Sequence, residues 1–244
     1  MLVMEGNARS SDVDRRLACI LAAIAGALNT AAFHAVGFFS ANMTGNVSAL
    51  SDHAALGEWL PGMFYLSIVL AFVLGAAVST LFINAGKRRR IRSIYAVSIF
   101  AEAVLMALLG CAYLWLSHAY RGQTLILGLS FLMGLQNAVV TTISGARVRT
   151  THISGMSTDI GIELSMLFDI ARGRERVVNA APCRMKLRLH AQTVFSFLVG
   201  GIIGVMVYQA IGGGLLFATA SVLLTISLLG IWQTLRSDAP VQPA

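Results

Sequence analysis

Long apolar stretches separated by short polar ones dominate the hydropathy pattern of this chain. A bilayer core is about 30 Å thick, and a helix needs about 20 mostly apolar residues to cross it. Six stretches are long enough: residues 17–39, 61–85, 93–117, 123–143, 192–211 and 214–235. The pattern predicts an all-α membrane protein with six transmembrane helices.

The composition agrees with this prediction. Hydrophobic residues make up 57% of the 244 residues and charged residues only 12%, whereas a soluble domain carries about 25% charged residues. Residues 1–16 are polar, and no small-residue cleavage site follows them closely, so the first stretch is expected to be an uncleaved helix.

The basic residues predict the orientation of the helices. With the N-terminus inside, all but Arg121 of the 18 Lys and Arg residues fall on the inner side. This follows the positive-inside rule and predicts a multi-pass protein of the bacterial inner membrane with both termini in the cytoplasm. The net charge of +7 therefore indicates orientation and contact with anionic lipid, not nucleic-acid binding.

The first and fourth stretches share a pattern of small and amide residues. Three residues of the first stretch recur 108 positions later: Gly26, Asn29 and Gly37 correspond to Gly134, Asn137 and Gly145. The pair Thr44-Gly45 recurs 110 positions later as Ser154-Gly155. A weaker echo relates Phe72 and Gly75 to Phe197 and Gly200. Because each half has three helices, the second half must enter the membrane from the opposite side, as in the inverted repeats of many secondary transporters.

This repeat predicts the organisation of the chain. Residues 1–16 form a cytoplasmic segment, 17–117 the first three-helix repeat, 118–235 the second, and 236–244 a cytoplasmic tail. The second repeat includes a basic cytoplasmic loop at residues 145–190.

Two motifs carry a resemblance to a known family. The first comprises AGALN at 25–29, VGFFS at 36–40 and MTGN at 43–46; the second comprises GLQNA at 134–138 and RTTHISG at 149–155. Both resemble signatures of the YoaK-like family of uncharacterised bacterial membrane proteins, and the likeness extends over about residues 17–235. The resemblance implies the same helical architecture and a permease-like role.

The repeated polar residues are the candidate substrate site: Asn29, Thr44, Gly45, Asn46, Asn137, Ser154 and Gly155. Segments 40–46 and 150–156 each follow a long helix and precede an apolar stretch, 47–56 or 160–170, that is too short to span the membrane. Broken helices in corresponding positions of two halves point to a transporter's binding site. The alternatives are helix packing for the Asn pair and ordinary helix caps for the two segments.

Ionisable residues are further candidates. Glu102 lies about 13 Å inside the third predicted helix, where a carboxylate is costly and usually functional, so it is a candidate for coupling-ion binding. His34, Asp159 and Glu163 are weaker candidates. A structural role stays open for Glu102 and His34, as do ion pairs of the two acids with Arg147, Arg149 or Arg172.

The chain has no phosphate-binding loop and no protease or esterase motif, so we expect neither ATP-driven transport nor an enzyme. Cys19, Cys111 and Cys183 lack metal or redox spacing, so no metal or cofactor is expected. A GxxxG spacing at 200–204 leaves a homo-oligomer open. The sequence favours a secondary transporter or permease for a small molecule or ion; a passive channel and a non-transporting subunit or scaffold are the alternatives.

Overall fold

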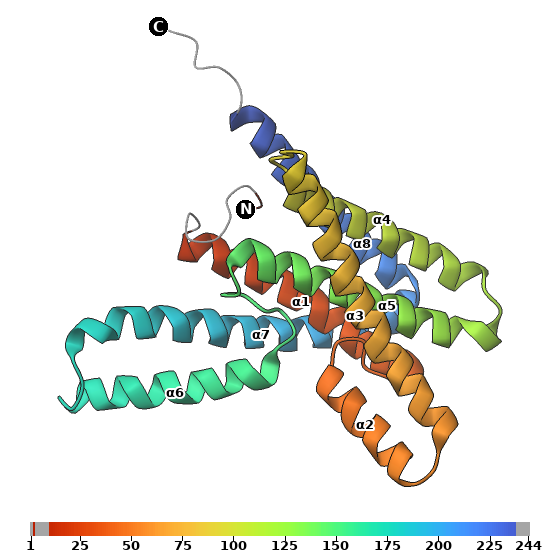
Figure 1. Cartoon of the computed structure of the whole chain (residues 1–244), viewed down its shortest axis with the longest axis horizontal. Helices are drawn as coiled ribbons and strands as arrows, with labels where there is room; N and C mark the ends of the chain where they lie inside the picture. Colours follow the sequence, from red (N-terminus) through yellow and green to blue (C-terminus); the bar gives the residue numbers. More distant parts are fainter. Residues whose placement is uncertain (1, 3–9, 238–244) are drawn as a thin grey trace, which may run out of the picture.

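The computed structural model describes residues 2 and 10–237, and within them the chain is helical and has no strand (Figure 1). The elements are α1 (Ser11–Val36), α2 (Met43–Ala55), α3 (Trp59–Arg88), α4 (Ile94–Trp115), α5 (His118–Ser144), α6 (Ile153–Ala171), the 3-10 turn η2 (Val177–Asn179), α7 (Ala180–Ile211) and α8 (Gly214–Ser237). Six of these helices, α1, α3, α4, α5, α7 and α8, are long and apolar enough to cross a membrane. The predicted fold class and the number of spanning helices are confirmed.

The ends of α1 follow from local sequence. It begins after Ser10, whose hydroxyl accepts a hydrogen bond from the N–H of Val13, so it starts earlier than the apolar stretch at residue 17. Asp12 and Asp14 in its first turn interact favourably with the positive end of the helix dipole. It ends at Gly37, where φ is 78°, a left-handed conformation that glycine adopts readily. The C-cap of α5, Gly145, has a φ of 60°, so both repeated glycines turn the chain at a helix end.

The two apolar stretches that were too short to span are parts of the short helices α2 and α6. The segment 145–190, expected as a basic loop, instead contains all of α6 and the first turns of α7. It is helical because the apolar side of α6, including the buried Met156, packs along α7. In the same way α2 packs along α3, so each short helix forms an antiparallel arm with the long helix that follows it (Figure 1).

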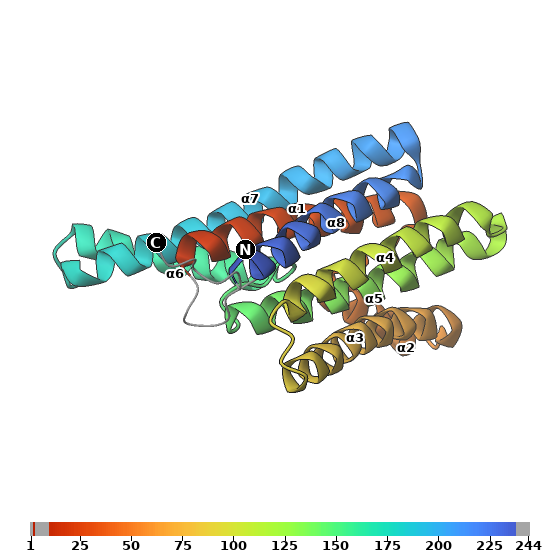
Figure 2. The same cartoon turned by 90° about the horizontal axis from the view of Figure 1, so that it is seen from above.

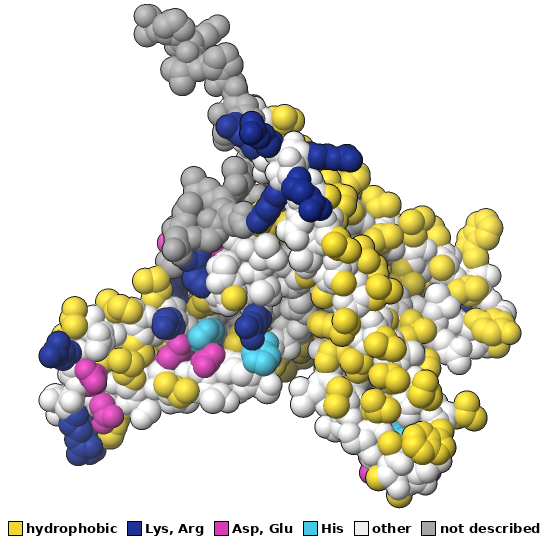
Figure 3. All heavy atoms as spheres, viewed as in Figure 1, with side chains coloured by type: hydrophobic (Ala, Val, Ile, Leu, Met, Phe, Trp, Pro, Cys, Tyr) yellow, Lys and Arg dark blue, Asp and Glu magenta, His cyan; other side chains and the backbone are white. Residues whose placement is uncertain are grey.

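The core lies among α1, α4, α5 and α8. Its fully buried side chains include Leu28, Met106, Met133 and Leu223. By contrast, α3 and α7 are the least buried of the spanning helices, and the space-filling view shows hydrophobic side chains over α3 and α4 (Figure 3). In a bilayer such apolar surface contacts lipid.

Glycines allow two pairs of helices to cross closely. In the α1–α7 pair, a Cβ at Gly26 would collide with the carbonyl oxygen of Phe197; in the α3–α5 pair, a Cβ at Gly134 would collide with that of Phe72. The GxxxG glycines Gly200 and Gly204 face the α1 backbone, so this spacing serves packing within the chain. Figure 2 shows α1 beside α7 and α3 near α5.

Candidate functional site

After α1 the chain turns back along the helix that it has just left. The side-chain Oδ1 of Asn29 accepts a hydrogen bond of 2.8 Å from the backbone N–H of Ala41. Asn29 lies seven residues before the last residue of α1, which corresponds to about 10 Å along a helix. The start of α2 is therefore held well inside the end of α1.

The chain after α5 returns in a similar way. The Nδ2 of Asn137 donates to the hydroxyl of Thr151 at 2.6 Å, and its Oδ1 accepts from the hydroxyl of Thr150 at 3.2 Å. The Nδ2 also reaches the carbonyl of Met133 at 3.1 Å. The duplicated Asn residues thus each fix the segment that leads into a short helix.

Both short helices begin at one cavity of 510 Å³, which we call the central cavity. Residues from both sequence repeats line it: Asn29, Phe39, Ala41, Asn42, Met43, Thr44 and Phe72 from the first, and Thr151, His152, Ile153, Ser154 and Phe197 from the second. Most of these correspond in the repeat, since positions 41–44 match 151–154 and Phe72 matches Phe197. From this shared start α2 and α6 run apart toward the tips of their arms (Figure 1).

Hydrogen-bond donors converge on the central cavity. The residue before α6, His152, makes no capping hydrogen bond, so within the described chain the N–H groups of the first turn of α6 lack a side-chain acceptor. In α2, the Oδ1 of Asn42 accepts from the N–H of Gly45 at 3.1 Å. Asn29 is only 6% exposed, and its Nδ2 has no acceptor among the residues that the structure describes. Asn137, which does not line this cavity, has both ends of its amide bonded.

Of the candidate set, Asn29, Thr44 and Ser154 therefore line the central cavity together, and the other four candidates do not line it. Asn46 is buried and donates to the carbonyl of Phe39 at 3.1 Å. Because residues two apart on a helix face different directions, Thr44 and Asn46 cannot both point into the cavity.

Gly45 and Gly155 lie within the first turns of α2 and α6, and neither has the positive φ expected of a turn. A Cβ on Gly45 would meet the amide of Asn42, and one on Gly155 would collide with the ring of His152. The glycines thus make room for the side chain that precedes each helix. The sequence pattern assigned no role to Asn42 or His152, although each lies inside a repeated segment, directly before a short helix.

Glu102 and His34 lie outside the central cavity. Glu102 is fully buried, and its Oε1 accepts from the Nε2 of Gln136 in α5 at 3.0 Å. The Oε2 of Glu102 and the Oε1 of Gln136 have no hydrogen-bond partner within the described chain. His34 is exposed and faces Tyr208, with ring centroids 6.1 Å apart.

The arginine partners considered for Asp159 and Glu163 are engaged elsewhere or lie apart. Glu163 is buried and its carboxylate lies 3.1 Å from the ring of His190, while Arg147 pairs with the buried Asp14 at 2.8 Å. Arg172 stacks on Phe168. Asp159 is exposed and lines a second cavity instead.

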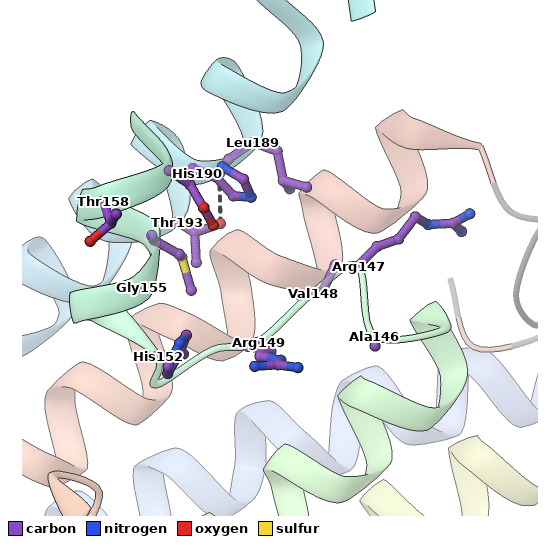
Figure 4. Close-up of a pocket in the computed structure, with 12 residues that line it drawn as sticks. Ala146, Arg147, Val148, Arg149, His152, Gly155, Thr158, Leu189, His190 and Thr193 are labelled. Carbon is purple, nitrogen blue, oxygen red and sulfur yellow. Dashed lines mark hydrogen bonds between the residues drawn. The ribbon is translucent and has the colours of Figure 1, made fainter. Parts of the chain in front are cut away.

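This inner cavity, of 460 Å³, lies between the α5–α6 loop, the start of α6, and α7 (Figure 4). His152 lines both it and the central cavity. The inner cavity also shares two lining residues, Arg147 and Leu189, with a groove of 630 Å³. This groove, which we call the basic groove, lies between the start of α1 and the start of α7. Charged and histidine side chains gather over the α6–α7 arm on the face shown in Figure 3.

Basic side chains outnumber acidic ones in the inner cavity and the groove. The basic ones are Arg15, Arg147, Arg149, Arg184, Lys186 and Arg188, and the acidic ones are Asp12, Asp14 and Asp159. Arg149 has no ion-pair partner in the part of the chain that the structure describes. The described residues contain no group of three or more His, Cys, Asp or Glu side chains that could hold a metal ion.

These features define a multi-pass α-helical membrane protein with two short helices that start at a common, partly open cavity. The chain belongs to the family described as "Protein of unknown function (DUF1275)", whose model matches residues 17–229. The match covers most of the region that resembles the YoaK-like family, and its description assigns no function. A comparison with curated proteins found no match, and a comparison with solved structures found none either.

Proposed function

We propose that this protein is a secondary transporter of small solutes in a bacterial inner membrane, with the central cavity as its substrate site. One observation carries the proposal: two short helices, one from each sequence repeat, begin at the same cavity between the spanning helices. Interrupted helices whose ends meet inside a helical bundle are how many transporters bind a solute at mid-membrane depth.

The proposal includes an inverted repeat of residues 17–117 and 118–235. The crossing of α1 with α7 at Gly26 and that of α3 with α5 at Gly134 use corresponding glycines, which supports a two-fold relation between the halves. In both views α1 and α7 run one way while α3 and α5 run the other way (Figures 1 and 2). Alternating access then consists of a movement of one half against the other around the cavity.

The orientation is proposed from the charges. The inner cavity and the basic groove lie at the end of the molecule that carries Arg15, Arg147 and Arg184. By the positive-inside rule this end is cytoplasmic. The cavities would then lead from the cytoplasm toward the central cavity through His152, and both termini would be cytoplasmic.

Ligand binding by the purified protein tests this function. A thermal-shift screen against small metabolites and ions should find a solute that raises the melting temperature, because a ligand of the folded state stabilises it by mass action. The shift should be lost in Thr44→Val and Ser154→Ala, and kept in Ser48→Ala, which lies on α2 but outside the cavity lining. Uptake into proteoliposomes then separates a carrier from a channel, because a carrier saturates and responds to a coupling gradient. A hit whose shift survives both cavity substitutions would contradict the proposed site.

A further inference from the structure

We propose that the transported solute is a small anion, a carboxylate or an oxyanion, which reaches the central cavity past Arg149 and His152. This inference rests on the transport function proposed above and names the substrate class of the same site.

The first reason is the pair of helix N-termini. Each N-terminus carries roughly half a positive elementary charge and presents N–H groups that the helix cannot satisfy. Because α2 and α6 both start at the central cavity, their dipoles add there instead of cancelling. Such ends are ready-made sites for anions.

The second reason is the amide of Asn29, which is independent of the helix ends. Its Oδ1 is occupied by the N–H of Ala41, which fixes the amide, and the Nδ2 donor is left without an acceptor in the described chain. Asn29 is nine-tenths buried and lines the central cavity. The Nδ2 atom itself is not fully buried, so it can be reached from the cavity, and the oxygen of a bound carboxylate or oxyanion would accept its hydrogen bond.

The third reason is the charge of the lining. Among the described residues that line the central cavity there is no Asp, Glu, Lys or Arg, so none of them neutralises a cation or repels an anion directly. The adjoining inner cavity contains Arg149, which has no ion-pair partner within the described residues, and Asp159 as its acidic side chain. Arg147 is paired with Asp14, so Arg149 supplies the uncompensated positive charge beside His152 (Figure 4). Clefts lined by charge of one sign concentrate ions of the other sign.

The test measures the charge preference of the cavity itself and needs no known substrate. Ser154→Cys is made in a background that lacks Cys19, Cys111 and Cys183, and is treated with anionic, cationic and neutral methanethiosulfonate reagents of similar size. The ratio of the anionic to the cationic rate at one cysteine does not depend on its thiolate fraction. This ratio is divided by the ratio that the same two reagents give with 2-mercaptoethanol in solution. The normalised ratio should favour the anionic reagent by at least about tenfold at low salt, and it should fall at high salt.

Two matched variants locate the source of the preference. Arg149→Gln should reduce the ratio several-fold, whereas Arg174→Gln should leave it unchanged, because Arg174 lies beyond the end of α6 and lines neither cavity. An equal rate for both charged reagents, or a cationic preference, while the neutral reagent reacts, would overturn the anion inference and leave the transport function standing. No reaction with any of the three reagents would show that the cavity is closed to water, which would overturn the proposed function as well.

Discussion

The Oδ1 of Asn29 accepts a hydrogen bond of 2.8 Å from the backbone N–H of Ala41, twelve residues further along the chain. This bond closes the turn that Gly37 begins, and it holds the segment that leads into α2 against α1. The bond therefore links a local turn to the formation of the central cavity.

Replacing Asn29 should separate its structural and binding roles. Asn29→Ala leaves the buried N–H of Ala41 without a partner and should cost about 1–3 kcal/mol of stability. Asn29→Asp keeps an acceptor for that N–H but replaces the free donor by a negative charge, so it should retain more stability than Asn29→Ala and still lose anion binding. Melting temperatures and ligand-induced shifts of the two variants check this. Equal ligand shifts in Asn29→Asp and the wild type would contradict the role of the Nδ2 group.

Gly26 should tolerate no side chain. In Gly26→Ala the new Cβ would collide with the carbonyl of Phe197, so α1 and α7 must separate; overpacking of this kind costs typically about 1–3 kcal/mol. Gly161→Ala is the matched control, because Gly161 is also helical, has open space around it, and gains helix propensity as Ala. We expect a lower melting temperature for the first variant and an equal or higher one for the second. An unchanged melting temperature in Gly26→Ala would mean that the α1–α7 crossing is looser than described.

Reporter fusions should establish the orientation. Alkaline phosphatase, which is active only in the periplasm, should be active when fused at Asp52 or His118, and green fluorescent protein fused at the same positions should not fluoresce. Fusions at Arg90 and Arg174 should show the reverse pattern. A fusion at Asp238, which lies outside the described residues, should also read cytoplasmic. A cytoplasmic signal at Asp52 would reverse α1 and remove the basis for the inverted repeat.

The variant Glu102→Gln should distinguish a role of Glu102 in proton coupling from a purely structural role. The amide oxygen of Gln can accept the bond from Gln136, so the variant should fold and express normally. If Glu102 carries the coupling proton, uptake into proteoliposomes driven by a proton gradient should disappear, while binding at the central cavity, which Glu102 does not line, should stay. Uptake with unchanged rate and pH dependence would make Glu102 a structural residue.

The number of spanning helices could be predicted from the sequence because each needs only a long apolar stretch. The end of α5 at Gly145 follows from the same pattern, whereas the first apolar stretch was expected to run to residue 39 and α1 ends at Gly37. The return of the chain to Asn29 could not be predicted, because it depends on a hydrogen bond between residues on different elements. For the same reason Thr44 and Asn46 looked equivalent in sequence, although only Thr44 lines the cavity.

The inner cavity could not be predicted from the sequence. Arg149 and His152 stood in a segment expected as a loop, and nothing in their spacing indicates that α7 forms the opposite wall with Leu189 and Thr193. The repeat did hold a usable signal at Asn42 and His152, which occupy corresponding positions before the two short helices.

The central claim is that Thr44 and Ser154 face each other across one solute site. Thr44→Cys and Ser154→Cys, combined in the background without native cysteines, should be bridged by a short bifunctional methanethiosulfonate linker. Intact mass spectrometry should then show one linker per chain joined at both ends. The control pair of Ser51→Cys with Ser154→Cys places the first thiol about 10 Å further along α2, so it should take up two separate linkers. A transported anion, added in excess, should slow the bridging of the first pair. Two separate adducts on the Thr44–Ser154 pair, at rates that no anion changes, would contradict the shared site.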